Sequence, residues 1–168
     1  DYVLCPSDKV EPFIEELKKQ VAAFFPTIEA NDDYTSIIND HHHARIQSMV
    51  DDARAKGATV VALNPANEKL SAAGRKLPLH VVTNLSDDMS IMQDEIFGPI
   101  LPIVPYDGLD AAIAYVNARP RPLALYYFDN SGKRTNQVLE QTTSGGTCVN
   151  DTVLHYTQQG LPFGGVGP

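Results

Sequence analysis

The sequence predicts an α/β fold in which a largely parallel sheet is flanked by helices. Apolar runs typical of buried strands alternate with amphipathic runs at helical spacing. Between residues 100 and 150 the order is strand, helix, strand, helix, strand, which favours βαβ units with right-handed crossovers. The length of 168 residues and the hydrophobic content of 43% are ordinary for one globular domain. We therefore expect a single domain over residues 1–168.

The first half of the chain begins with an expected strand over residues 2–5, which Pro6 stops. A helix follows between Pro12 and Pro26, because apolar residues recur at helical spacing at Phe13, Leu17, Val21 and Phe24. A second helix is predicted to start at Asp40 as its N-cap and to end at Gly57. Its apolar face carries Ile46, Met49, Val50 and Ala53.

Strands dominate the rest of the prediction. The expected elements are a buried strand over 58–63, a loop over 64–78, a strand over 80–83, a strand over 100–106, a helix capped by Asp107, a strand over 123–128, a helix over 132–142 and a strand ending at 150. Val138 and Leu139 are the predicted core contacts of the last helix. Because open α/β sheets bind ligands at the carboxyl ends of their strands, the loops near 106–108, 129–131 and 150–163 are candidate site edges.

Composition excludes several classes of function. The formal net charge is −8 and the Lys and Arg residues form no basic stripe, so we expect no nucleic-acid partner. No apolar run is long enough to span a bilayer, so we expect no membrane partner. Cys5 and Cys148 make no disulfide framework, which favours the cytoplasm. The chain opens on DYVLC and stops in a Gly-rich loop, and we expect it to be a piece of a longer protein.

Three patterns have plain structural interpretations. Residues 41–43 are consecutive histidines, but successive side chains on a helix diverge by about 100° and chelate one ion poorly, so we favour a helix start with exposed imidazoles and expect no metal. Cys5 and Cys148 lie in apolar strands, where core packing is favoured over nucleophilic chemistry. Residues 160–167 lack the Lys-Ser/Thr of a phosphate-binding loop, and their glycines favour close approach to another surface.

The segment QDEIFGPILP, residues 93–102, is the strongest candidate site. Glu95 and Phe97 share one face of an extended segment. A carboxylate accepts hydrogen bonds from both hydroxyls of a sugar diol, and a ring two residues further on can lie against the flat part of the same ligand. The alternative is an acidic loop that leads into a buried strand. The residues alone leave both interpretations open.

Five motifs occur together and in order: DYVL at 1–4, QDEIFGPILPIVPY at 93–106, ARPRPLALYYF at 118–128, TTSGGTCVND at 142–151 and LPFGGVGP at 161–168. They resemble the aldehyde dehydrogenase superfamily, and PLALYYF and LPFGGVG resemble its class 3 branch. DDARAKGA at 51–58 and NARPRPLALYYF at 117–128 are most similar to bacterial coniferyl aldehyde dehydrogenases. The resemblance spans essentially all 168 residues.

The resemblance implies that the chain is the C-terminal part of the catalytic domain. The catalytic cysteine, the water-activating glutamate and the cofactor-binding domain then lie outside it, so we assign no catalytic residue here. By the same resemblance, Glu95 binds the ribose hydroxyls of NAD or NADP and Phe97 packs near the nicotinamide. Phe163 lines the aldehyde pocket, and His155 and Tyr156 belong to the variable loop that selects the substrate.

The implied activity is NAD(P)-dependent oxidation of aromatic or hydrophobic aldehydes, such as coniferaldehyde, to carboxylic acids through a cysteine thioester. The implied partners are a small aldehyde substrate and a second copy in a homodimer of the intact enzyme, and we expect the 168-residue piece alone to be inactive. One alternative is a stand-alone α/β binding module without catalysis. The other is a semialdehyde or acyl-CoA-forming dehydrogenase of the same superfamily.

Overall fold

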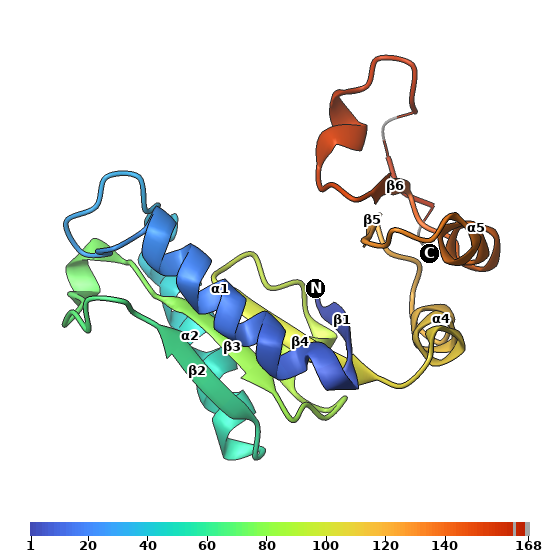
Figure 1. Cartoon of the computed structure of the whole chain (residues 1–168). Helices are drawn as coiled ribbons and strands as arrows, with labels where there is room; N and C mark the ends of the chain where they lie inside the picture. The colour runs from blue at the N-terminus through green and yellow to red at the C-terminus, as the bar shows by residue number, and fades with distance from the viewer. Residues whose placement is uncertain (163, 167–168) are drawn as a thin grey trace. The chain divides into compact units, whose positions relative to one another are not determined.

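A computed structural model describes residues 1–162 and 164–166 of the chain (Figure 1). The chain divides into two compact units, residues 1–105 and residues 106–168. We call them the N-terminal unit and the C-terminal unit and describe each by itself. Both contain strands and helices, and the predicted α/β class is confirmed. No helix in the described part of the chain is long and apolar enough to cross a membrane.

The N-terminal unit is built around a four-stranded sheet. Its strand order is β1 (Val3–Pro6), β4 (Ile100–Tyr106), β3 (Leu79–Thr83) and β2 (Thr59–Leu63). β3 and β4 pair in parallel, as the prediction of a largely parallel sheet requires, with His80 opposite Ile100. β2 pairs with β3 in the antiparallel direction, which no local pattern in the sequence indicated.

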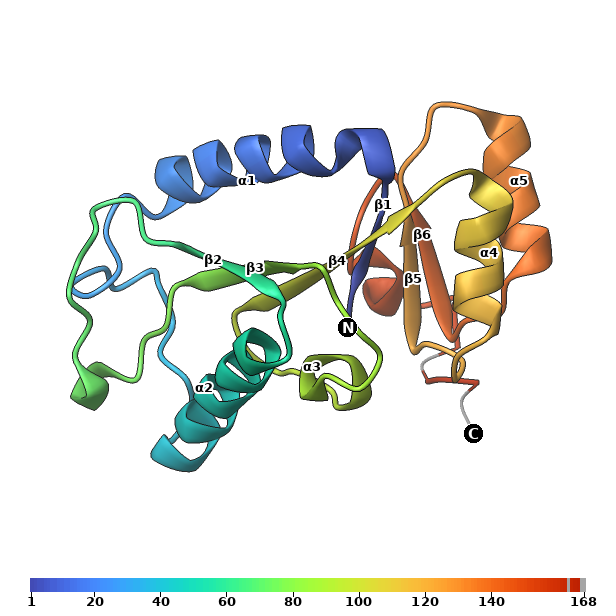
Figure 2. The ribbon, with the colours of Figure 1, turned by 90° about the horizontal axis from the view of Figure 1, so that it is seen from below.

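Two helices cover opposite faces of this sheet, α1 (Val10–Phe24) and α2 (Asp40–Ala55) (Figures 1 and 2). Successive residues of a strand point to opposite faces, so the neighbours Val81 and Val82 enter different apolar clusters. Val81 joins Ile14, Val21 and Ile103 under α1. Val82 joins the α2 residues Ile46, Met49, Val50 and Ala53. The predicted apolar face of the second helix is therefore confirmed.

Two details of the N-terminal unit differ from the prediction. β2 is an edge strand rather than a buried one, because Thr59 and Ala62 are exposed and only Leu63 is fully buried. The N-cap of α2 is Asn39 rather than Asp40. The Asn39 side chain accepts a hydrogen bond of 2.8 Å from the His42 amide, while Asp40 already has helical backbone.

The C-terminal unit contains a two-stranded parallel sheet, β5 (Ala124–Tyr127) and β6 (Gly146–Val149). α4 (Leu109–Asn117) and α5 (Gly132–Gln141) lie side by side next to it (Figure 2).

The remaining elements of the two units are short: η1 (Ser7–Lys9), η2 (Ala72–Gly74), α3 (Ser90–Gln93) and η3 (Leu154–Thr157). The N-cap of α4 is Gly108, at φ 81°, and not Asp107. Val138 is buried as predicted, but Leu139 is 44% exposed and is not a core contact.

Candidate functional site

Glu95 and Phe97 lie at a corner of the N-terminal unit that separates α3 from β4. Glu95 is exposed, and Phe97 is 77% exposed even though it is a large apolar side chain. Ile96, between them, is only 1% exposed and belongs to the core under α2. The buried isoleucine anchors the corner, and the residues on either side of it face outward.

We expected an extended backbone from Glu95 to Phe97, but the backbone is not extended at Phe97. Phe97 has φ 47°, in the left-handed region that residues with side chains adopt infrequently. The next residue, Gly98, has no space for a side chain, because a Cβ atom there would lie 2.5 Å from Ile46 Cδ1. The chain therefore turns at Phe97 and Gly98 before β4 begins at Ile100, which is buried as predicted.

Glu95 and Phe97 line the same cavity, of about 760 Å³. The other walls come from the same unit and include Tyr34, Ile37 and His42. The exposed surface of the cavity is mostly apolar, and Asp33, Arg45 and Glu95 add charged groups to it. Binding sites for cofactors commonly have this composition, with a few polar groups on a mostly apolar wall. Glu95 and Phe97 therefore share one cavity, and their contacts with a sugar diol and a flat ring stay a prediction.

Arg45 of α2 reaches this corner, and sequence analysis did not identify it. Its guanidinium donates hydrogen bonds to the carbonyl oxygens of Glu95, at 3.3 Å, and Ile96, at 2.5 Å. The Ile96 amide donates to a carboxylate oxygen of Asp1 at 3.3 Å. These contacts join residues 50 to 95 positions apart in the sequence, and no local pattern could have predicted them.

The predicted substrate-loop residues His155 and Tyr156 lie in η3 of the C-terminal unit. The His155 ring lies against Gly146, where a Cβ atom would come within 2.3 Å of His155 Cδ2. His155 Nδ1 is 3.5 Å from the sulfur of Cys148, so this buried thiol has a histidine neighbour that sequence could not reveal. Tyr156 is 56% exposed. The third predicted residue, Phe163, lies outside the described residues.

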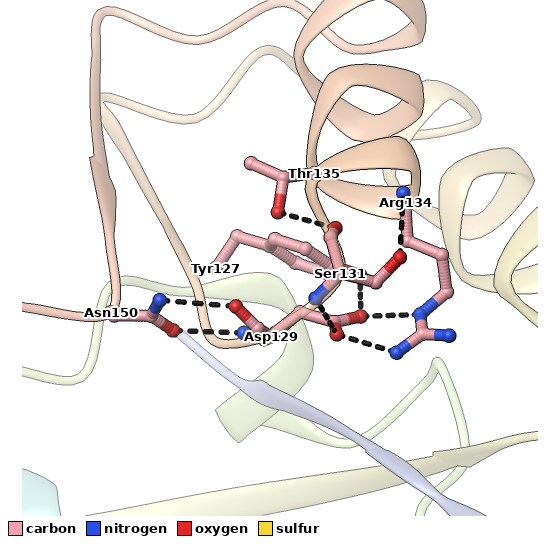
Figure 3. A network of polar contacts seen from close by, with 6 residues as sticks. All are labelled: Tyr127, Asp129, Ser131, Arg134, Thr135 and Asn150. Atoms are coloured by element: carbon pink, nitrogen blue, oxygen red, sulfur yellow. Dashed lines mark hydrogen bonds and ion pairs between the residues drawn. The ribbon is translucent and has the colours of Figure 1, made fainter.

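A polar network joins the carboxyl ends of β5 and β6 (Figure 3). Asp129 accepts two hydrogen bonds of 2.5 Å from Arg134 and others from the Ser131 amide and the Tyr127 hydroxyl. The Asn150 side chain accepts a hydrogen bond from the Asp129 amide and donates one to the Asp129 carbonyl. The site edges near 129–131 and 150 are thus tied together.

The charges in this network are strongly coupled. The Arg134 guanidinium, the Ser131 amide and the Tyr127 hydroxyl hold the pKa of Asp129 well below its ordinary value. Burial, followed by the adjacent Asp129 carboxylate, raises the pKa of Tyr127 to about 12. Since both carboxylate oxygens are already hydrogen-bonded, the arrangement is suited to holding two loops rather than to exchanging protons.

The consecutive histidines 41–43 lie in the first turn of α2 as expected, but only His41 is exposed, and His42 and His43 are partly buried. Cys5 is buried, and burial, followed by the charge of Asp8, raises the pKa of its thiol. Among the described residues, no group of three His, Cys, Asp or Glu side chains is placed to hold a metal ion. A Cβ atom at Gly145 would lie 2.9 Å from the Gly164 carbonyl oxygen, so the backbone of the 160–167 segment does approach another part of the chain closely, as its glycines led us to expect.

Comparison with known proteins gives consistent results. The family model described as "Aldehyde dehydrogenase family" matches residues 1–168. A "Probable coniferyl aldehyde dehydrogenase" of Pseudomonas aeruginosa is 52% identical over 168 residues, which are all of this chain but 34% of that protein. The chain thus spans a minor part of such relatives.

Solved structures agree in fold. The substrate-bound AldH of Staphylococcus aureus superposes with a TM-score of 0.88 at 34% identity, covering 99% of this chain and 35% of that one. A betaine aldehyde dehydrogenase of Staphylococcus aureus in complex with NAD+ gives a TM-score of 0.82 at 25% identity, covering 99% and 33% respectively.

Proposed function

Because the chain belongs to the aldehyde dehydrogenase family, we propose that it is part of an NAD(P)-dependent enzyme that oxidises aromatic or hydrophobic aldehydes to carboxylic acids. The 168 residues are one part of its catalytic domain, and the nucleophilic cysteine and the main cofactor-binding domain lie elsewhere in the intact protein. The single observation that carries the proposal is the outward-facing pair Glu95 and Phe97 on one cavity, in a chain that matches the family throughout. The name of the 52% identical relative supports coniferaldehyde as a representative substrate.

In this proposal the chain binds and orients the cofactor. The exposed Glu95 carboxylate accepts hydrogen bonds from two neighbouring ribose hydroxyls, which fixes the sugar. The exposed Phe97 ring covers an apolar face next to it. A nicotinamide held by Glu95 and Phe97 would supply the hydride acceptor, once the nucleophilic cysteine has added to the aldehyde, and loss of the hydride would leave a cysteine thioester that water hydrolyses to the acid. Glu95 and Phe97 form no bonds to the substrate and contribute by positioning.

The main experiment assays the intact protein with coniferaldehyde and benzaldehyde, in parallel with NAD and with NADP. Reduced nicotinamide should appear by absorbance, and the carboxylic acid by chromatography. Added coenzyme A should leave the product an acid, whereas a thioester product would indicate the acyl-CoA-forming alternative. Absence of reduced cofactor with every aldehyde tested overturns the proposal.

The role of Glu95 is tested by Glu95→Ala in the intact protein. Loss of the carboxylate should weaken the binding of the cofactor, with a rise of at least about tenfold in its KM, because the charge-assisted hydrogen bonds to the two ribose hydroxyls are lost. The matched control is Asp94→Ala, since Asp94 is also an exposed carboxylate but does not line the cavity. Equal kinetics for the two variants at all cofactor concentrations contradict the assignment.

We further propose that the intact enzyme is a cytoplasmic homodimer. Both cysteines of the chain are free and buried, which agrees with a reducing compartment. Light scattering of the intact protein measures the mass directly. A mass that stays at one chain over a wide concentration range contradicts the dimer.

A further inference from the structure

The corner that carries Glu95 and Phe97 is held by main-chain contacts on both sides of Ile96. The Arg45 guanidinium donates hydrogen bonds to the carbonyl oxygens of Glu95 and Ile96, and the Asp1 carboxylate accepts a hydrogen bond from the Ile96 amide. The Ile96 side chain is buried in the core, so the peptide planes around it have little freedom to rotate. The directions of the two outward-facing side chains follow from these planes.

Arg45 is suited to this task by its chemistry. A guanidinium presents several N–H donors in one rigid plane, so a single side chain can hold two successive carbonyls at fixed positions. The side chain is partly buried and also contacts the sulfur of Met49, one turn further along α2. Within the described residues, the guanidinium pairs with main-chain carbonyls and not with a carboxylate. It therefore acts as a fixed main-chain clamp rather than as half of an ion pair.

The residue after Arg45 constrains the same corner. Ile46 occupies the space in which a Gly98 side chain would stand. Phe97, directly before Gly98, has a left-handed backbone that is unfavourable for a residue with a Cβ atom. Such a conformation persists only where the surrounding structure holds it. Two neighbouring residues of α2 thus fix a strained turn that directs Phe97 into the cavity.

Arg45 also lines the cavity beside Glu95 and Phe97. We propose that Arg45 is a positioning residue of the enzyme, which sets the orientation of Glu95 and Phe97 toward the cofactor through the main-chain carbonyls of residues 95 and 96. The inference rests on the proposed function, because it assigns Arg45 a part in cofactor orientation. Misplacement of about 1 Å at a reacting group can cost about a hundredfold in rate. The clamp should therefore affect cofactor use far more than it affects aldehyde binding.

The test compares three variants of the intact protein. Arg45→Met removes the donors and keeps the apolar stem, and Arg45→Lys keeps the charge without the planar fork. Arg54→Met is the matched control, because Arg54 lies on the same helix and pairs with the exposed Asp51. Arg45→Met should lower kcat/KM for the cofactor by about tenfold to a hundredfold and change the KM for the aldehyde by less than about twofold. Arg45→Lys should restore part of the loss, and Arg54→Met should match the wild type.

A second comparison separates positioning from general destabilisation. If Arg45 acts through the corner, Arg45→Met should cost several-fold less when Glu95→Gln is already present, because the group that it orients is altered. Full additivity of the two losses overturns the inference, as does a cofactor kcat/KM in Arg45→Met equal to that of Arg54→Met.

If Arg45→Met fails to fold, the kcat/KM values of Arg45→Lys for the cofactor and for the aldehyde test the inference instead. A loss confined to the cofactor supports the inference, and an equal loss for cofactor and aldehyde, or no loss, overturns it. Failure of the proposed function is distinct, because the wild type itself would then reduce no cofactor.

Discussion

Different kinds of interaction stabilise the interior of each of the two units. The N-terminal unit has a four-stranded sheet with a helix on each face and buries two clusters of aliphatic side chains. The C-terminal unit has two strands and buries Ala112, Ile113, Val138 and Cys148, while large apolar side chains such as Leu123 and Phe128 are 67% and 62% exposed. Its strand ends are fastened by the charged network around Asp129.

This difference shows how sheet size decides what stabilises a fold. A sheet with both faces covered stabilises itself by removing apolar surface from water. A two-stranded sheet by itself is only marginally stable, so directional polar contacts have to hold the loops at the ends of its strands. The comparison predicts that core truncation dominates in the first unit and that charge changes matter more in the second.

The largest expected effect is that of Ile103→Ala in the N-terminal unit. Ile103 is fully buried, and truncation should lower the free energy of unfolding by about 2–5 kcal/mol through lost burial and the cavity left behind. Leu123→Ala in the C-terminal unit removes a comparable side chain that is 67% exposed, and should change the free energy by less than about 0.5 kcal/mol. Denaturant unfolding measures both. Similar losses would remove the contrast between the units.

The next effect concerns two glycines with different surroundings. Gly98→Ala forces a methyl group against Ile46 and should cost about 1–3 kcal/mol of stability. Gly132→Ala, at the start of α5, meets no atom within 4 Å and should stabilise by up to about 1 kcal/mol through lower unfolded-state entropy. Thermal unfolding distinguishes the two signs. If Gly98→Ala left the stability unchanged, the Ile46 side chain would have to move aside at little energetic cost, which contradicts the prediction.

Asp129→Asn should loosen the C-terminal unit at neutral pH. The pKa of Asp129 is lowered on folding, so its carboxylate contributes full stability above its unfolded pKa of about 3.9 and loses that contribution as the pH falls further. The variant should therefore show faster amide exchange in α5 at neutral pH and a weaker loss of protection below about pH 4. The control is Asp110→Asn, since Asp110 accepts one hydrogen bond from Gln137 in the same unit. Identical profiles for the two variants would contradict a special role for Asp129.

The smallest effect is expected at His80 in β3. Burial is the main cause that lowers its pKa in the folded state, and its Nδ1 atom has no hydrogen-bond partner among the described residues. The unfolded chain takes up the proton first, so stability should decline as the pH falls below about 6.5, by no more than about 1.4 kcal/mol per pH unit. His80→Leu should remove this slope, whereas His41→Leu, at an exposed position, should keep it. Parallel slopes for all three proteins would contradict the prediction.

Local sequence patterns were sufficient for most elements. Apolar spacing predicted α1 and the apolar face of α2, and the run from Ile100 to Tyr106 is a strand with the predicted bounds. The motif around Glu95 and Phe97 predicted that both side chains face one ligand; both line one cavity, and the binding of a cofactor there stays a prediction. Helices and strands depend on neighbours within a few positions, so the amino-acid order alone predicts them.

Tertiary structure decided the features that depend on distant pairs. The edge position and antiparallel direction of β2 and the hydrogen bond from Arg45 to Ile96 join segments that local periodicity treats separately. The left-handed turn at Phe97 belongs with them, because the space left by Ile46 and the carbonyl contacts of Arg45 define it. Sequence thus determined which side chains are available at the site, and packing determined the direction in which they point.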